Sequence, residues 1–313
     1  MIEIERLTKH YDGRAVVQDV SLRIETGSVT AIVGTSGSGK STLLRMINRL
    51  VVPSSGRVRI DGADTTSLPA PVLRRRIGYV IQDIGLFPHW TAARNIATVP
   101  ELLGWPKAEV AARVEELLRM FQLDPAEIGP RFPDQLSGGQ AQRVGVARAL
   151  AARPDVLLMD EPFGALDPLI RQRARQDLRA IQQRLGTTVL IVTHDMDEAL
   201  SLGDRIAVMR AGRIEQFDTP DRLLRAPATP FVRELIGERD RALRLLALLP
   251  LGPLLSPGRA DGTALSVETS LADALAAMIW QGRDRLPVHD ENDRPLGIVT
   301  REAVLAAGRS SPE

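Results

Sequence analysis

The sequence predicts an α/β protein with a mixed, mostly parallel sheet, followed by a small C-terminal α+β module. Three observations predict this. Short β-branched runs alternate with longer helical patterns over the first two thirds of the chain. A glycine-rich turn beginning at Gly34 joins an apolar run to a helical pattern. After Gly237 the pattern changes to a stretch rich in Arg, Leu and Pro, and then to a series of short strands and helices.

Three short apolar runs, residues 30–33, 156–159 and 188–192, predict the central strands of the sheet. Each run is bounded by Gly, Asp or Thr and lacks polar alternation, which is typical of strands buried on both faces. Helical patterns follow at residues 40–49, 107–121, 140–152, 168–185 and 197–201. Pro106 and Pro168 stand at two helix starts, where proline is tolerated because the missing N–H group has no partner in the first turn.

Composition limits the possible functions. The chain has 313 residues, a formal net charge of +1 and no cysteine, which excludes disulfides and thiolate metal sites. No bulk charge attracts nucleic acid, and Arg74–Arg76 lacks interleaved aromatic residues, so we expect a solvated face there. The N-terminus lacks the apolar segment of a signal peptide. The most apolar stretch, residues 245–255, is broken by prolines and is shorter than the roughly 20 residues that span a bilayer.

The glycine-rich turn has the residue pattern of a phosphate-binding loop. Successive backbone N–H groups can surround a phosphate where the chain enters a helix, and the glycines permit a turn that side chains would block. Lys40 is expected to reach the β- and γ-phosphates, and the Ser41 hydroxyl to bind Mg²⁺. The expected ATP-binding residues of this segment are Gly34, Thr35, Ser36, Gly37, Ser38, Gly39, Lys40, Ser41 and Thr42.

A second chemical feature is the pair of acids that ends the strand at residues 156–159. Ligands of α/β sheets bind beyond the carboxyl ends of the strands, where Asp160 and Glu161 lie. Asp160 is expected to hold Mg²⁺, and Glu161 to orient and deprotonate an attacking water. The alternative is a strand end that is merely capped by acids, but the phosphate-binding loop upstream makes hydrolysis the better interpretation.

The segment Leu136, Ser137, Gly138, Gly139 and Gln140 lies between these two features and opens a helix. With it, the sequence resembles the ATPases of the ABC transporter family. A serine hydroxyl, bare glycine amides and a helix N-terminus form a second anion site. Since the chain already has one phosphate-binding loop, a spare site suggests a partner subunit. The resemblance implies a head-to-tail dimer of two copies with ATP between the loop of one and the signature segment of the other.

The resemblance implies roles for four further residues. Tyr11 falls where an aromatic ring stacks on adenine, and without the family context a strand-edge tyrosine would be favoured. Gln82 matches a glutamine that senses Mg²⁺ and the attacking water. Asp167 matches a loop that crosses the dimer interface, in Ala165-Leu-Asp167. His194, after the run at 188–192, matches a histidine that contacts the γ-phosphate.

A narrower resemblance runs through residues 77–90 and 95–100, together with 46–50. These segments look like ATPases of importers for glycine betaine, choline, carnitine and related quaternary amines. An exposed aromatic patch is predicted at Phe87, His89 and Trp90, and it suits contact with a helix of a membrane permease near residues 82–95. The alternative is that Phe87 and Trp90 pack in the core. The resemblance implies an ATPase at the cytoplasmic face of the inner or plasma membrane, working indirectly with a substrate-binding protein and without nucleic acid.

Other functions stay open to different degrees. An importer ATPase for another solute, such as an amino acid, fits the same motifs, because solute never touches this subunit. ATPases that act on DNA insert long coiled coils or zinc modules, for which there is no space between Lys40 and His194 and no cysteine. Ribosome-associated members carry two ATPase units, and this chain shows the motifs once.

We expect an ATPase domain at residues 1–237 with a helical subdomain at about 83–152, a linker at 238–262 and a small module at 263–309. Residues 286–290 and 297–300 of this module resemble a CBS (cystathionine β-synthase) module. Such modules bind adenine nucleotides as tandem pairs and have an aspartate three residues after a threonine. Thr300 is present, but Ala303 stands at the aspartate position. We therefore expect no tight nucleotide binding; a structural role between two subunits and a sensory role both stay open.

Overall fold

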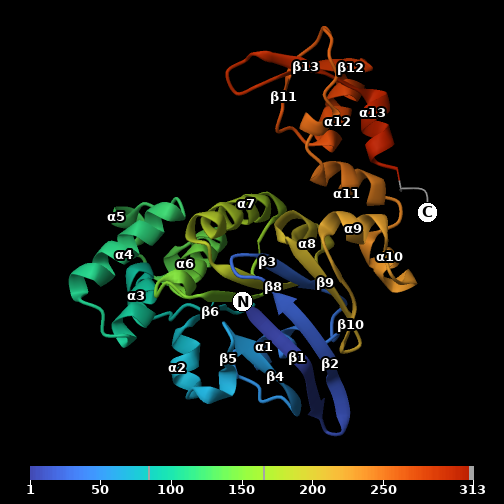
Figure 1. The fold of residues 1–313 in the computed structure, drawn as a ribbon. Coiled ribbons are helices and arrows are strands. Elements are labelled where there is room, and N and C mark those ends of the chain that lie inside the picture. The colour runs from blue at the N-terminus through green and yellow to red at the C-terminus, as the bar shows by residue number, and fades with distance from the viewer. Residues whose placement is uncertain (84, 165, 310–313) are drawn as a thin grey trace. The chain divides into compact units, whose positions relative to one another are not determined.

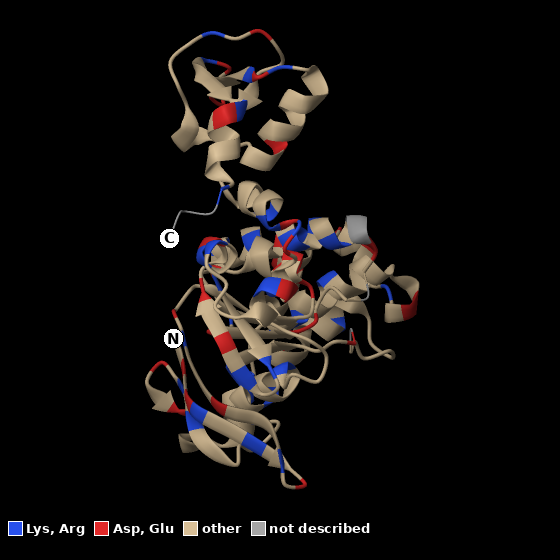
Figure 2. Ribbon diagram, turned by 90° about the vertical axis from the view of Figure 1, so that its right-hand side faces the viewer, with Lys and Arg blue, Asp and Glu red and all other residues tan. Residues whose placement is uncertain are grey.

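The computed structural model describes residues 1–83, 85–164 and 166–309, in two compact units that divide after Phe217. Ile84 and Ala165, which belong to the segments resembling transporter ATPases, lie outside the described residues. Lys and Arg are interspersed with Asp and Glu along the helices and strands of both units (Figure 2). Within the described ranges, no helix is long and apolar enough to cross a membrane.

The first unit contains a four-stranded antiparallel sheet in the order β2-β1-β4-β5 (Figure 1). Its alternate residues are buried along β1, as expected for a sheet with one face on the core. Register shifts in β1 mark irregular pairing near residues 5–10, where the strand runs toward Tyr11. The strands are β1 (Ile2–Tyr11), β2 (Arg14–Ile24), β4 (Ser55–Ile60) and β5 (Ala63–Asp64).

The second sheet of this unit has six strands in the order β10-β9-β3-β8-β7-β6. The pairs β3–β8, β3–β9, β7–β8 and β6–β7 are parallel, so the predicted mostly parallel sheet is confirmed. Every residue of β3, β7 and β8 is buried, which explains why these strands are continuous apolar runs in the sequence. The strands are β3 (Val29–Val33), β6 (Ile77–Val80), β7 (Val156–Asp160), β8 (Thr188–Thr193), β9 (Arg205–Arg210) and β10 (Arg213–Asp218).

Helices surround this sheet and form a separate group beside it. Helix α3 packs on α4, α5 and α6 (Figure 1), and the helical subdomain at about residues 83–152 stays a prediction. Helix α1 packs on β7 and β8, and α8 on β3. The helices are α1 (Lys40–Ile47), α2 (Ala70–Arg75), α3 (Ala92–Leu102), α4 (Lys107–Met120), α5 (Pro125–Ile128), α6 (Gly138–Leu150), α7 (Pro168–Leu185) and α8 (Met196–Leu202), with short 3₁₀ turns at Thr65–Ser67 and Pro133–Gln135.

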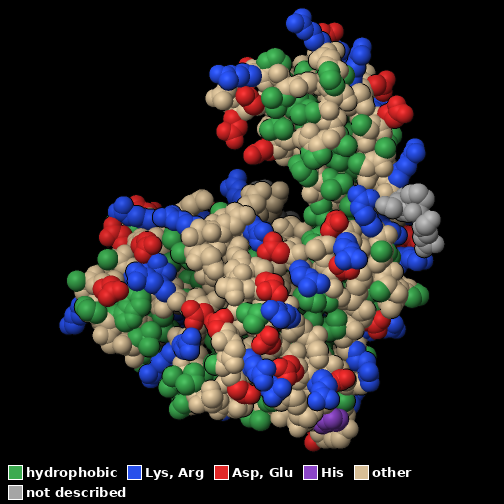
Figure 3. All heavy atoms as spheres, viewed as in Figure 1, with side chains coloured by type: hydrophobic (Ala, Val, Ile, Leu, Met, Phe, Trp, Pro, Cys, Tyr) green, Lys and Arg blue, Asp and Glu red, His purple; other side chains and the backbone are tan. Residues whose placement is uncertain are grey.

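The second unit is built on a three-stranded sheet in the order β11-β12-β13. The series of short strands and helices predicted after Gly237 is confirmed. Large apolar side chains are exposed on this unit, at Ile279, Trp280, Leu296 and Leu305, and Figure 3 shows hydrophobic side chains among charged ones on its visible face. The elements are α9 (Pro220–Arg225), α10 (Pro230–Ile236), α11 (Arg241–Leu248), a 3₁₀ turn (Gly252–Leu254), β11 (Leu265–Ser266), α12 (Leu271–Gln281), β12 (Arg285–His289), β13 (Pro295–Thr300) and α13 (Arg301–Ala307).

Residues between α10 and β11 contribute to the core of the second unit. Leu246 and Leu251 are buried in the same apolar cluster as the helices and strands of the module. Ser256 and Ile298 exchange two backbone hydrogen bonds of 2.9 Å each. Gly297 has a φ of +149°, and a Cβ atom there would lie 2.5 Å from the carbonyl oxygen of Ser256, so only glycine fits this close approach. These contacts lie within the predicted linker, and the domain boundaries themselves stay a prediction.

Candidate nucleotide-binding and hydrolysis site

The phosphate-binding loop connects the end of β3 to the start of α1, as predicted. Its backbone packs tightly against neighbouring chain segments at two glycines. A Cβ atom on Gly34 would lie 2.1 Å from the carbonyl oxygen of Met209. Gly39 has a φ of +102°, and its Cβ atom would lie 2.5 Å from the carbonyl oxygen of Val16. Both glycines are therefore required by the shape of the loop.

The side chain of Lys40 is folded back onto its own loop. It is 5% exposed, and its Nζ donates hydrogen bonds to the carbonyl oxygens of Gly34 at 2.9 Å and Thr35 at 3.0 Å. Burial lowers the pKa of Lys40 from its ordinary value, while Glu161 and Asp160 act in the opposite direction. The cation is thus held inside the loop by two neutral acceptors, which a phosphate group can replace.

Ser41 and Asp160 lie together at the start of α1 and the end of β7. The Ser41 hydroxyl donates a 2.8 Å hydrogen bond to Oδ1 of Asp160, whose side chain is buried. The guanidinium Nη2 of Arg45 lies 3.8 Å from Oδ2 of the same aspartate. No sequence motif indicates Arg45, although its position four residues after Ser41 places both on one helix face. The Ser41 hydroxyl and the Asp160 carboxylate are oxygen ligands of the kind that Mg²⁺ binds together with phosphate oxygens.

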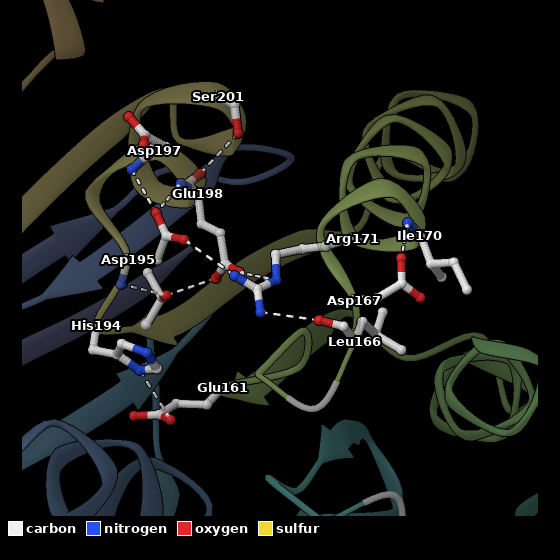
Figure 4. A network of polar contacts seen from close by, with 11 residues as sticks. Glu161, Leu166, Asp167, Ile170, Arg171, His194, Asp195, Asp197, Glu198 and Ser201 are labelled. Atoms are coloured by element: carbon white, nitrogen blue, oxygen red, sulfur yellow. Dashed lines mark hydrogen bonds and ion pairs between the residues drawn. The ribbon is translucent and has the colours of Figure 1, made fainter. Parts of the chain in front are cut away.

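Glu161 follows Asp160 in a strained backbone conformation, with a φ of +47°. Its N–H donates a 2.9 Å hydrogen bond to the carbonyl oxygen of Val192, which joins the ends of β7 and β8. Its Oε2 lies 3.1 Å from Nδ1 of His194, so the two predicted catalytic side chains are in contact (Figure 4). A carboxylate and an imidazole in this arrangement can hold and deprotonate a water molecule.

The loop and these side chains surround a hollow of about 430 Å³. Predicted residues from four separate chain segments line it, namely Ser36, Gly37, Gly39, Lys40, Ser41, Thr42, Gln82, Glu161 and His194, together with Val16, which the sequence did not indicate. Since the carboxyl ends of β3, β7 and β8 meet at one sheet edge, the side chains that follow them converge there. Among the described residues, no group of three or more acidic or histidine side chains forms a separate metal site.

Tyr11 lies outside this set of lining residues. It ends β1, it is 44% exposed, and the Nζ of Lys9 lies 4.9 Å from the centre of its ring. The exposed ring is accessible to an adenine, but the structure does not place it in the hollow.

The signature segment also lies outside the lining residues, at the exposed start of α6. The Ser137 hydroxyl accepts a 3.3 Å hydrogen bond from the Gln140 N–H, and the Ser137 N–H donates to Oε1 of Gln140 at 2.9 Å. This capping box fixes the first turn of the helix. Ser137 and Gly138 are exposed, whereas a Cβ atom on Gly139 would lie 2.9 Å from the Ile170 side chain. The segment is therefore a rigid, accessible helix N-terminus.

Asp167 caps α7, the helix that packs on α6. Its Oδ1 accepts a 3.1 Å hydrogen bond from the Ile170 N–H, and its own side chain is exposed (Figure 4). The signature helix and the Asp167 loop thus present exposed polar groups from adjacent elements.

The aromatic segment before α3 is held by Asn95, which is completely buried. Asn95 Oδ1 accepts a 2.8 Å hydrogen bond from the Phe87 N–H, and its Nδ2 lies 3.2, 3.1 and 3.1 Å from the carbonyl oxygens of Phe87, Trp90 and Thr91. Phe87 is 40% exposed and its ring centre lies 4.6 Å from that of Trp90. The predicted exposure of this patch is confirmed for Phe87 and His89, whereas Trp90 is half-buried.

Helix α6 also reaches this segment. Arg148 Nη1 donates a 2.8 Å hydrogen bond to the carbonyl oxygen of Gly85, and the guanidinium lies 5.7 Å from the centre of the Phe87 ring. Burial lowers the pKa of Arg148. The helix that begins with the signature segment therefore contacts the loop that follows Gln82.

Comparisons with known proteins identify the family. The ABC transporter family model matches residues 17–164, and the CBS domain model matches residues 263–310. The glycine betaine uptake system ATP-binding protein YehX of Escherichia coli is 47% identical over 306 residues, which cover 97% of this chain and 99% of that protein. The osmoprotectant import ATP-binding protein OsmV of Salmonella typhimurium is 46% identical, covering 98% of this chain and 81% of that protein. The chain belongs to the ABC transporter family of ATP-binding subunits.

Solved structures support the same assignment. A dimeric, post-hydrolysis structure of the ATP-binding cassette MJ0796 bound to ADP and Pi is 35% identical, with a TM-score of 0.63, and covers 70% of this chain and 99% of that chain. CbiO1 from Clostridium perfringens, part of the cbiONQ transporter complex, has a TM-score of 0.68 at 30% identity, covering 77% and 97%. This protein is an ABC-type ATPase that binds adenine nucleotide, with a C-terminal CBS domain.

Proposed function

We propose that this chain hydrolyses ATP to energise import of an osmoprotectant, such as glycine betaine or a related quaternary amine, through partner permease subunits. The observation that carries the proposal is similarity along the whole chain, CBS domain included. Relatives named for glycine betaine, osmoprotectant or carnitine transport match 97–98% of this chain. Sulfate/thiosulfate import relatives match 75–77% of it at 47–48% identity, and a relative named for choline transport matches 76% at 49% identity.

We assign chemical roles from the geometry of the hollow. Lys40 binds the β- and γ-phosphates by exchanging its two carbonyl acceptors for phosphate oxygens. Ser41, Asp160 and Gln82 would hold Mg²⁺, which would neutralise charge on the phosphates. Glu161 accepts a proton from the attacking water, and His194 holds the Glu161 carboxylate and faces the γ-phosphate.

A second copy of the chain completes the site. No signature residue lines the hollow, yet Ser137 and Gly138 form an exposed anion-binding helix N-terminus. We therefore place the signature segment of one subunit on the γ-phosphate held by the other, with the Asp167 loops between them. The related cassette MJ0796 is described as dimeric with ADP and Pi bound, which supports this arrangement.

The permease is proposed to dock on the segment from Gln82 to Asn95. Phe87 and His89 are exposed there, and Arg94 and Arg148 lie against Trp90 and Phe87 respectively. A short helix with apolar and acidic side chains suits this surface. The ATPase then works at the cytoplasmic face of the membrane, and an extracytoplasmic substrate-binding protein selects the solute.

Glu161→Gln tests the enzymatic part. It keeps the phosphate contacts and loses the base, so Mg-ATP should bind and trap a dimer while turnover falls by about 10²–10⁴-fold. Steady-state turnover and gel filtration with ATP measure these effects, with exposed Arg173→Met as a matched surface control. Turnover near that of the wild type would assign the base elsewhere.

Transport tests the solute. The chain and its permease subunits, reconstituted in vesicles with the substrate-binding protein, should take up labelled glycine betaine only with internal ATP. Uptake of sulfate or an amino acid instead of a quaternary amine would replace the osmoprotectant with that solute, while leaving the ATPase assignment intact.

A further inference from the structure

A polar network links the loop before α7 to the segment that carries His194, and Arg171 is at its centre (Figure 4). Arg171 lies in the first turn of α7, four residues after the cap Asp167. Its Nη2 donates a 3.0 Å hydrogen bond to the carbonyl oxygen of Leu166. Its Nη1 lies 3.6 Å from Oδ2 of Asp195, and its Nε lies 4.0 Å from Oε1 of Glu198. One guanidinium therefore contacts both segments.

The two carboxylates that face Arg171 build the turn around His194. Asp195 Oδ1 accepts hydrogen bonds from the N–H groups of Asp197 and Glu198, at 2.8 and 3.1 Å, and so caps α8. Glu198 Oε2 accepts a 2.6 Å hydrogen bond from the hydroxyl of Thr193, which accepts one from the Asp195 N–H at 3.0 Å. The neighbours of His194 on both sides, Thr193 and Asp195, are thus held by hydrogen bonds within this turn. Arg171 contacts the two carboxylates that take part, those of Asp195 and Glu198.

The electrostatics give Arg171 a specific role in this turn. Glu198 is 3% exposed, and burial raises the pKa of its carboxyl group, as does the nearby Asp195, while the Thr193 hydrogen bond, Arg175 and Arg171 act in the opposite direction. Two carboxylates close together need a cation between them, and a planar guanidinium can face both while donating to a carbonyl oxygen. Arg175 contributes to the same compensation at Glu198, and Arg171 in addition donates to the carbonyl oxygen of Leu166.

We infer that Arg171 is a positioning residue: it fixes the turn carrying His194 to the loop at Leu166 and Asp167, and acts on ATP hydrolysis through His194. The inference rests on the proposed role of His194 beside Glu161. Arg171 is not among the residues that line the hollow.

Steady-state kinetics on the full chain test the inference. Arg171→Met should lower kcat by about 10–100-fold, the cost of a small misplacement of a reacting group. KM for ATP should stay within about twofold, since the phosphate-binding loop is unchanged. Arg171→Lys should recover part of kcat, because its ammonium keeps a positive charge opposite Asp195 and Glu198. The control Arg173→Met removes an exposed cation from the same helix and should behave as the wild type.

A double-mutant cycle with His194→Ala separates positioning from a general structural role. In the His194→Ala background, Arg171→Met should change kcat by less than about twofold, because the residue through which it acts is gone. An equal loss of kcat in both backgrounds would overturn the inference, as would an unchanged kcat in the single variant. If Arg171→Met does not fold, Arg171→Lys replaces it in the double-mutant cycle with His194→Ala.

The outcomes also separate this inference from the proposed function. Wild-type kcat in His194→Ala would overturn both the inference and the role given to His194. The ATPase assignment would still stand if Glu161→Gln were inactive. If kcat falls in Glu161→Gln and in His194→Ala, but Arg171→Met lowers kcat equally with and without His194, the inference about Arg171 is wrong and the proposed function stands.

Discussion

Replacing Asn95 by alanine should loosen the aromatic segment without affecting the nucleotide site. The completely buried amide makes one hydrogen bond with the Phe87 N–H and shares its two N–H groups among three carbonyl oxygens. Losing two or three such bonds at about 1 kcal/mol each, less about 0.5 kcal/mol gained from the helix preference of alanine, gives a local cost of about 1.5–2.5 kcal/mol. The segment from Phe87 to Trp90 should open that much more readily.

Hydrogen exchange at the Phe87 amide measures this cost directly. A change of about 1.5–2.5 kcal/mol corresponds to roughly 10–70-fold faster exchange. Thr98→Ala is the matched control, because its hydroxyl donates only to Arg94 and Asn95 carbonyl oxygens within α3. ATP turnover of the isolated subunit should be retained, while permease-coupled transport falls. Unchanged exchange at Phe87 in Asn95→Ala would refute the claim that this side chain holds the segment.

Four further predictions follow from the same structure. Ser137→Arg should lower ATP turnover by about 10²-fold by blocking the anion site offered to the second subunit, and unaffected turnover would refute the head-to-tail dimer. Tyr11→Ala should weaken ATP binding by roughly 1–3 kcal/mol in calorimetry if the exposed ring stacks on adenine, and unchanged affinity would remove it from the site. A fragment beginning at Asp218 should not bind ATP, AMP or cyclic dinucleotides in titrations. The reason is that Ala303 lacks a carboxylate and its N–H already donates to the Thr300 hydroxyl. Micromolar binding of any of these nucleotides would restore a sensory role. Asp204→Asn should cost about 1 kcal/mol in unfolding free energy above pH 5, because both side chains of the Asp204–Arg179 pair are partly exposed and solvent weakens their attraction. The difference from the wild type should vanish as the pH falls further.

The sign of that last prediction follows from the Asp204 environment. Burial alone would raise the pKa of Asp204, but hydrogen bonds from Arg179 and the Val29 N–H outweigh it and lower the pKa below the ordinary value. A carboxyl group with a lowered pKa binds fewer protons in the folded state, so its stabilisation is present above the unfolded pKa and is lost as the pH falls through the folded one. Urea unfolding at several pH values between 3 and 7 measures the difference. A difference that grows on acidification would refute this assignment.

The sequence by itself determined the elements that depend on local patterns. The apolar runs of β3, β7 and β8 are visible because a strand buried on both faces cannot alternate. The phosphate-binding loop is equally local, since its glycines and Lys40 form one continuous segment. Gln82, Glu161 and His194 were predicted from a family resemblance, and the structure brings them to one hollow.

Only the tertiary structure decided which distant side chains touch. The order β3-β8-β7 and its register bring His194 within 3.1 Å of Glu161 and Ser41 within 2.8 Å of Asp160, and these distances depend on strand pairing that no local pattern encodes. Asn95 is a polar residue in an amphipathic helix, yet it is completely buried, because the loop before the helix folds back over it. Arg171 reaches Leu166, Asp195 and Glu198 for the same reason: helix α7 returns beside the end of β8, and contacts between segments far apart in the sequence exist only once the sheet has formed.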